Sequence, residues 1–140
     1  MAKIRHMAIY TDDPVRLAEF YCDVFGLEKK QETHTEKGGH AVWLTDGYLE
    51  VALINPEKRD SPRGMNHFGF TLEAEEREGV YKRLKAKGVE PMEAPKDRPY
   101  IEDAVLDPDG NKFDISTTGL RPEPETAAAF GGVNGAAILR

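Results

Sequence analysis

Two stretches of similar pattern decide the fold: KIRHMAIYTDDP at residues 3–14 and MNHFGFTLEAEE at residues 65–76. Each opens with side chains that alternate in character, and a period of two residues is that of a β-strand. In the first stretch the alternation predicts Ile4, His6 and Ala8 on one face of the strand. Acidic residues follow in both stretches, as is typical of the start of a helix. The sequence therefore predicts a strand that leads into a helix at two places in the chain.

Both helices are expected to end at a glycine, Gly26 in the first and Gly88 in the second, because glycine readily adopts the left-handed conformation that ends many helices. A hairpin follows each helix. Residues 41–44 and 48–54 flank an Asp-Gly turn, and residues 104–106 and 112–116 flank the turn at 107–110. The distance from His6 to Gly26 is 20 residues and that from His67 to Gly88 is 21 residues. The chain is therefore a tandem repeat of two equivalent modules, at about 3–55 and 65–118.

We expect these modules to form a single α+β domain over residues 1–118. Residues 55–64 contain prolines and charges and are predicted to link the modules. The polar stretch 29–39 is predicted to be an edge strand or a loop. Residues 119–140 are predicted to be a C-terminal tail, with a possible short helix at 124–130.

Composition excludes several classes of protein. The chain has 140 residues, with 19 Lys and Arg against 25 Asp and Glu, and its net charge of -6 argues against a nucleic-acid partner. No apolar run approaches the roughly 20 residues that span a bilayer, so no membrane partner is expected. Cys22 is the single cysteine and cannot form an internal disulfide, which favours a cytoplasmic location.

Four polar residues occupy equivalent strand positions in the two modules, on the side opposite the apolar residues: His6, Glu50, His67 and Asp114. Because one slipped residue would move each of them to the other face, their shared placement is a coordinated pattern. Two imidazoles and two carboxylates suit a divalent ion such as zinc, nickel, cobalt, manganese or iron(II). The sequence therefore predicts a metal site formed by these four residues.

Other candidates lie around this set. His34 and His40 are in the polar stretch without counterparts in the second module, and we expect them at the surface or at a pocket rim. Arg98 is suited to pair with an acidic substrate group. The residues predicted to line a substrate pocket are Trp43, Tyr48, Arg98 and Tyr100.

The chain resembles the vicinal oxygen chelate superfamily, which includes glyoxalase I, methylmalonyl-CoA epimerase, extradiol dioxygenases, and fosfomycin- and bleomycin-resistance proteins. The resemblance rests on IRHMAI at residues 4–9, NHFGF at residues 66–70 and DPDGN at residues 107–111, and it covers about residues 3–118. It implies paired βαβββ modules that form a cupped, barrel-like mixed sheet around a metal ion. The family's ligand positions fall on the four residues named above. The last of these positions usually carries Glu, whereas this chain has the shorter Asp114, which argues against glyoxalase I chemistry in particular.

The resemblance implies a metal-dependent lyase or isomerase that acts on a small metabolite chelated through adjacent oxygens. Glu50 and Asp114 are the candidate bases, while His6 and His67 would hold the ion. Three alternatives stay open: an extradiol-type dioxygenase, a non-catalytic protein that sequesters a drug or metabolite, and a thiol-transferring resistance enzyme. Both the resemblance and the exposed edges of each module's sheet predict a homodimer.

Overall fold

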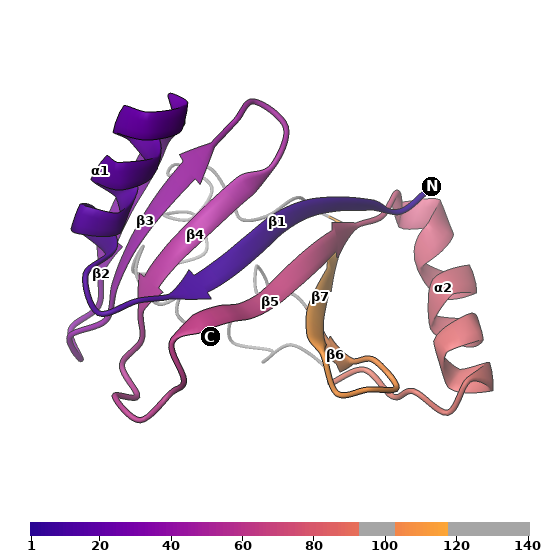
Figure 1. Cartoon of the computed structure of the whole chain (residues 1–140). Coiled ribbons are helices and arrows are strands. Elements are labelled where there is room, and N and C mark those ends of the chain that lie inside the picture. Colours follow the sequence, from indigo (N-terminus) through magenta and orange to yellow (C-terminus); the bar gives the residue numbers. More distant parts are fainter. Residues whose placement is uncertain (93–102, 118–140) are drawn as a thin grey trace.

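The computed structural model describes residues 1–92 and 103–117 (Figure 1). The predicted tail, its short helix and residues 93–102 lie outside the described residues. In chain order the elements are β1 (Lys3–Tyr10), α1 (Pro14–Phe25), β2 (Glu28–His34), β3 (His40–Thr45), β4 (Glu50–Asn55), β5 (Gly64–Thr71), α2 (Ala74–Ala86), β6 (Asp103–Leu106) and β7 (Lys112–Ser116). Neither described helix is long and apolar enough to cross a membrane.

The strands form one open mixed sheet in the order β2-β3-β4-β1-β5-β7-β6. Within each module the first strand is parallel to the last, β1 to β4 and β5 to β7, and the two modules join through the antiparallel pair of β1 and β5. An isolated bridge between Met92 and Ala104 occupies in the second module the place that β2 occupies in the first. The predicted α+β fold of two repeated modules in a mixed sheet is thus confirmed, and the described sheet is not closed.

Local chemistry explains where the helices begin and end. The Asp13 carboxylate accepts a hydrogen bond of 3.0 Å from the backbone N–H of Arg16, which satisfies a donor that the helix leaves unpaired. Gly26 ends α1 with a φ of 73°, as predicted from its glycine. At α2, Glu73 and Glu76 form a reciprocal capping box.

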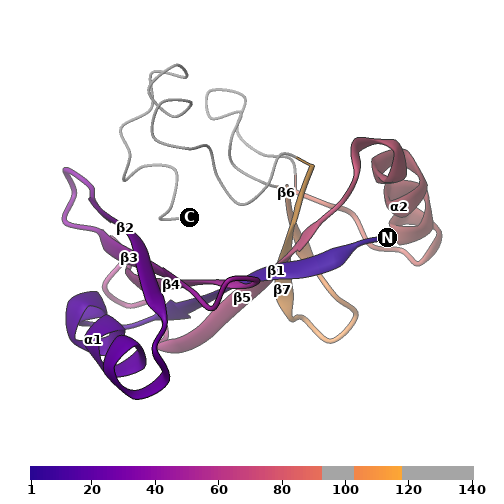
Figure 2. The ribbon, with the colours of Figure 1, turned by 90° about the horizontal axis from the view of Figure 1, so that it is seen from above.

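Both helices lie on the outer side of the bent sheet, one near each end (Figure 2). In the first module, Ala18 of α1 packs in a buried cluster with strand residues Val42, Leu44 and Leu53. In the second, side chains of α2 cover a strand cluster made of Leu72, Val105, Phe113 and Ile115. Each module therefore buries apolar strand side chains against its own helix on the outer side of the sheet.

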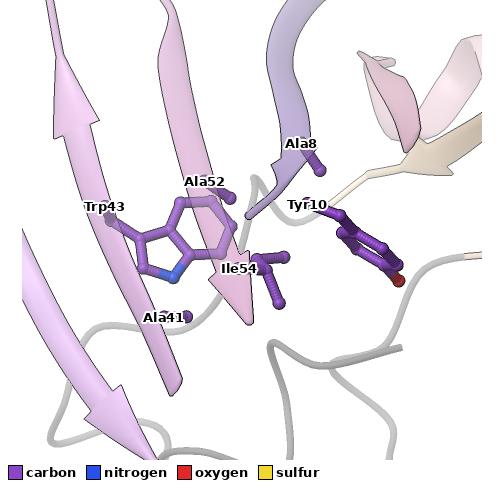
Figure 3. Packing of buried hydrophobic residues seen from close by; sticks show 6 residues of the cluster. All are labelled: Ala8, Tyr10, Ala41, Trp43, Ala52 and Ile54. Atoms are coloured by element: carbon purple, nitrogen blue, oxygen red, sulfur yellow. The ribbon is translucent and has the colours of Figure 1, made fainter. Parts of the chain in front are cut away.

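A further buried cluster lies on the inner face of the first module (Figure 3). Trp43 pairs in register with Ala52, which in turn pairs with Ala8 on the next strand. The members of this cluster are Ala8, Tyr10, Ala41, Trp43, Ala52 and Ile54. Since paired residues share a face of a sheet, the aromatic residues here lie on the same face as the polar row described below.

A β-bulge in β1 corrects one prediction. Ile4 pairs with Phe70, whereas His6 pairs with Gly69, so Arg5 is an extra residue in β1. A bulge of this kind reverses the alternation of side chains along a strand. Ile4 therefore shares a face with Phe70 on the helix side, and the expectation that it lies beside His6 is wrong.

Candidate metal centre

Three buried side chains from three strands meet on the inner face of the sheet. The Nε2 atom of His67 lies 3.1 Å from Oδ2 of Asp114, and Nε2 of His6 lies 3.7 Å from the same oxygen. The two imidazole rings are 5.4 Å apart and nearly perpendicular. One ligand atom from each residue falls within 4.8 Å of the others. Two imidazoles and a carboxylate thus face one another where water has little access.

The register of the central strands brings these residues together. His6 on β1 pairs with Gly69 on β5, and Gly69 pairs with Asp114 on β7. His67 precedes Gly69 by two residues and pairs with Ala8, so it belongs to the same face. The parity of the strands therefore predicts the shared face correctly for these three residues.

Gly69 provides the space that the cluster needs. A Cβ atom at this position would lie 1.9 Å from Cε1 and 2.3 Å from Nδ1 of the His6 ring. The imidazole therefore lies directly over the β5 backbone, on the path from β1 to Asp114 on β7. The alternation along this strand predicts no role for Gly69, although a glycine in the middle of a strand is a known signal of close approach.

Asn66 orients the second histidine. Its Oδ1 lies 2.7 Å from Nδ1 of His67. An amide oxygen accepts, so this contact suits a hydrogen bond from Nδ1 of His67, and in that neutral tautomer Nε2 is the nitrogen that would bind a metal ion. Asn66 is the extra residue of a second bulge, between the pairs that β5 makes with Ala8 and Ile9. The sequence alternation alone places Asn66 on the opposite face and therefore misses this contact.

Glu50 lies in the same row as the cluster, on the other side of His6. It is the register partner of His6 on β4, and its carboxylate Oε1 lies 2.5 Å from Nζ of Lys30. It is not part of the group of ligand atoms that His6, His67 and Asp114 form. Lys30 is itself an extra residue in β2, and this bulge re-aims its side chain. The structure therefore brings together three of the four predicted ligands and pairs the fourth with a lysine that sequence analysis did not identify.

The predicted pocket residues have different surroundings. Trp43 is buried in the inner-face cluster of Figure 3. Tyr48 precedes β4 instead of belonging to it, is half exposed, and has the guanidinium of Arg5 4.6 Å from the centre of its ring. Arg98 and Tyr100 lie outside the described residues.

A second group of possible ligands lies on β2 and β3, and it consists of Glu32, His34 and His40. The side chain of His34 is 65% exposed and that of His40 is 21% exposed. Hydrogen bonds from Lys29 and then from His40 lower the pKa of Glu32 to about 2. The sequence pattern predicts the two histidines at the surface or at a pocket rim, but it does not connect them with Glu32.

The donor atoms of the buried cluster fit a divalent ion of borderline softness. Imidazole nitrogen and carboxylate oxygen bind zinc at about 2.0–2.2 Å, and the same donors suit nickel, cobalt, manganese and iron(II). The three side chains supply those donors from a buried position, and the Asn66 contact to His67 is the kind of support that such ligands usually have.

The sequence model of the Glyoxalase/Bleomycin resistance protein/Dioxygenase superfamily matches residues 3–115. A search among curated proteins found no significant match.

Several solved structures share the fold. A hypothetical protein from Bacillus halodurans C-125 is 17% identical, with a TM-score of 0.65 over 87% of this chain and 98% of the other. Methylmalonyl-CoA epimerase from Mycobacterium tuberculosis is 18% identical, with a TM-score of 0.65 over 89% and 91% of the two chains. A variant of the Streptomyces coelicolor methylmalonyl-CoA epimerase, in complex with 2-nitronate-propionyl-CoA, is 19% identical, with a TM-score of 0.60 over 84% and 98%. With the sequence match covering both repeats, the chain belongs to the Glyoxalase/Bleomycin resistance protein/Dioxygenase superfamily.

Proposed function

We propose that this protein is a metal-dependent isomerase or lyase of the glyoxalase type, which moves a proton on a small metabolite that chelates through adjacent oxygens. One observation carries the proposal: a buried cluster of two imidazoles and a carboxylate lies in a row with a second, more accessible carboxylate, Glu50. The structural likeness to methylmalonyl-CoA epimerases supports an isomerase-type reaction as the first to be tested.

His6, His67 and Asp114 are the residues that would hold the ion, with Glu50 as a fourth ligand. A divalent ion bound there would act as a Lewis acid toward the substrate oxygens. Asp114 is fully buried and faces both imidazoles, which suits a permanent ligand.

Glu50 is our candidate for the base that removes a proton next to a carbonyl group. Its side chain is 16% exposed, whereas that of Asp114 is not exposed at all, so Glu50 is the carboxylate that a substrate can reach. The Glu50 carboxylate accepts a hydrogen bond from the ammonium group of Lys30, 2.5 Å away. Asp114 remains the second candidate base.

The length of the last ligand bears on the substrate. Asp114 is one methylene shorter than the glutamate usual at this position in the family, so it is less able to leave the ion and return. The shorter side chain therefore favours a base other than Asp114. It also favours a substrate other than the hemithioacetal of glyoxalase I.

We further propose a cytoplasmic homodimer whose functional unit spans residues 1–118. Its partner is a small molecule instead of a nucleic acid or a membrane, in keeping with the acidic net charge of -6.

The test begins with apoprotein that is reconstituted separately with zinc, nickel, cobalt, manganese and iron(II). Each form is incubated in deuterated water with candidate α-protonated acyl thioesters and 2-oxo or 2-hydroxy acids, and exchange of the α-hydrogen is followed by NMR. We expect exchange that depends on the metal. In Glu50→Gln the exchange is lost while the metal stays bound, whereas Asp114→Asn also loses metal.

A matched control is Glu19→Gln, which removes an exposed carboxylate from α1. It should leave metal content and exchange unchanged. If Glu50→Gln exchanges as fast as the unmodified protein, Glu50 is not the base. If metal-free protein binds an aromatic drug tightly and no form exchanges, the sequestration function replaces the proposed one.

A second candidate function is an extradiol-type dioxygenase, and one observation favours it. The three clustered ligands are two histidines and one carboxylate, while Glu50 is engaged by Lys30, and a site of two histidines and one carboxylate with open positions is typical of non-haem iron(II) oxygenases. Oxygen consumption with catechol, seen in the iron(II) form and absent from the zinc form, would establish this alternative.

A further inference from the structure

The second group of possible ligands lies at one edge of the sheet, away from the proposed centre on β1, β5 and β7. Glu32 and His34 belong to β2, which is an edge strand, and His40 opens β3 (Figure 1). His34 and His40 are direct register partners, and Glu32 is two residues before His34, so all three side chains share a face. Glu32 pairs with Val42, which packs among the residues that contact α1. This face is therefore the outer one, opposite the buried cluster.

The three side chains converge on one point. Nε2 of His40 lies 2.8 Å from Oε1 of Glu32, and Nε2 of His34 lies 3.7 Å from the same oxygen. The two imidazole rings are stacked, with centres 4.0 Å apart and planes inclined by 19°. All three ligand atoms lie within 4.8 Å of one another.

These distances are close to those between ligand atoms that bind the same ion. Zinc bonds of about 2.0–2.2 Å in a tetrahedron place neighbouring ligand atoms roughly 3.3–3.6 Å apart. The observed separations from the carboxylate oxygen, 2.8 and 3.7 Å, bracket that range. Because the two imidazole planes are nearly parallel, the more exposed His34 ring must turn so that its Nε2 points at the same ion as that of His40.

The surroundings keep the three residues in place. The other carboxylate oxygen of Glu32 contacts Nζ of Lys29, so Oε1 is the oxygen that faces the histidines. The turn between the strands is closed by a backbone hydrogen bond of 2.9 Å from Thr35 to Gly39. Arg59 donates to the backbone oxygen of Gly38 at 3.3 Å and anchors this turn to the linker between the modules. These contacts therefore hold the hairpin in place before an ion binds.

We propose that Glu32, His34 and His40 form a second metal site, which takes a divalent transition-metal ion such as Zn²⁺ or Ni²⁺ and leaves the remaining positions to water. Two imidazole nitrogens and one carboxylate oxygen are ligands that both ions accept. Because the ligands come from both strands of the hairpin, the ion clips the edge strand β2 to β3. It contributes to the stability of the folded chain without taking part in the proposed reaction.

The experiment is a titration of chelator-treated full-length protein with Zn²⁺, and then with Ni²⁺, with bound metal measured by elemental analysis. We expect two ions per chain. His34→Ala and His6→Ala should each lose one of the two, and the double variant should lose both. His34 is exposed, so its replacement leaves the fold intact, which circular dichroism checks. Glu36→Gln, an exposed carboxylate in the same turn, is the matched control and should retain both ions.

A stability measurement separates the two sites further. Zn²⁺ should raise the melting temperature of His6→Ala, because a ligand that binds only the folded state stabilises it, and should not raise that of the double variant. A single ion that is lost in His6→Ala and kept in His34→Ala would overturn this proposal and leave the buried centre standing. A single ion with the reverse response would support the surface site and refute the buried one.

Discussion

Replacing Gly69 with alanine is the sharpest test of the buried cluster, because it adds one methyl group at the point where the His6 ring lies over β5. The new Cβ would be 1.9, 2.3 and 2.7 Å from three atoms of that ring. Ordinary contact begins at 3.4 Å, so the imidazole must retreat by about 1.5 Å. Gly69 does not have a positive φ, so alanine meets no backbone strain there.

The magnitude follows from that displacement. Overpacking of a buried position costs about 1–3 kcal/mol of unfolding free energy. The displacement of the ring is comparable with the length of a metal–nitrogen bond, which is about 2.0–2.1 Å. His6 can therefore no longer bind the same ion as Asp114. We therefore expect Gly69→Ala to lose both stability and metal.

A double-mutant cycle assigns the loss to the His6 ring. In a His6→Ala background the overlap is gone, and Gly69→Ala should be neutral or stabilising by about 0.4–1 kcal/mol through reduced entropy of the unfolded chain. The coupling is the difference between these two effects and should therefore be roughly 1–4 kcal/mol. Urea unfolding gives the free energies, and titration with Zn²⁺ gives the binding.

The control is Gly79→Ala in the middle of α2, where the nearest atom to a new Cβ is the flexible end of Arg83 at 3.3 Å. This change should stabilise the chain by roughly 0.5–1 kcal/mol, as expected for a glycine inside a helix. Two results would refute the reasoning. One is that Gly69→Ala binds metal as the unmodified protein does. The other is that Gly69→Ala changes the free energy of unfolding by the same amount in the unmodified protein and in His6→Ala.

Other expectations follow from the same structure. Lys30→Met frees Glu50 and removes a positive charge, so metal binding at the buried centre should tighten in calorimetry, while Lys37→Met, in the exposed turn, should leave it unchanged. Asn66→Ala should weaken metal binding by about 10- to 100-fold, because the neighbouring histidine loses the acceptor at Nδ1. Burial, and a hydrogen bond to the Asp103 carboxylate, raise the pKa of Tyr81. The neutral phenol therefore stabilises the fold below its unfolded pKa of about 10, and this contribution is lost as the pH rises above that value. Tyr81→Phe should cost about 1 kcal/mol at neutral pH and flatten the alkaline limb of a stability profile. Light scattering should give twice the chain mass of 15.6 kDa, and a monomer at micromolar concentration would contradict the homodimer.

The sequence by itself determined the repeat, the boundaries of the helices and the face on which the buried ligands lie. Asp13 and Gly26 mark the ends of α1 through local chemistry that acts within one turn of the chain. His67 and Asp114 alternate with apolar residues that must pack against a helix. The period of two residues therefore places these two ligands on the opposite face of the sheet before any strand pairing is known.

Only the tertiary structure decided how that face is used. The bulges at Arg5, Lys30 and Asn66 have no local signature, because a bulge arises from the pairing of two strands and not from either one alone. They set His6 over Gly69 and turn Lys30 toward a carboxylate 20 residues away. Glu32 meets His40 for the same reason, since their contact depends on the register of β2 and β3. Side-chain parity is a property of each strand, whereas contacts between strands depend on non-local register, which the sequence pattern does not contain.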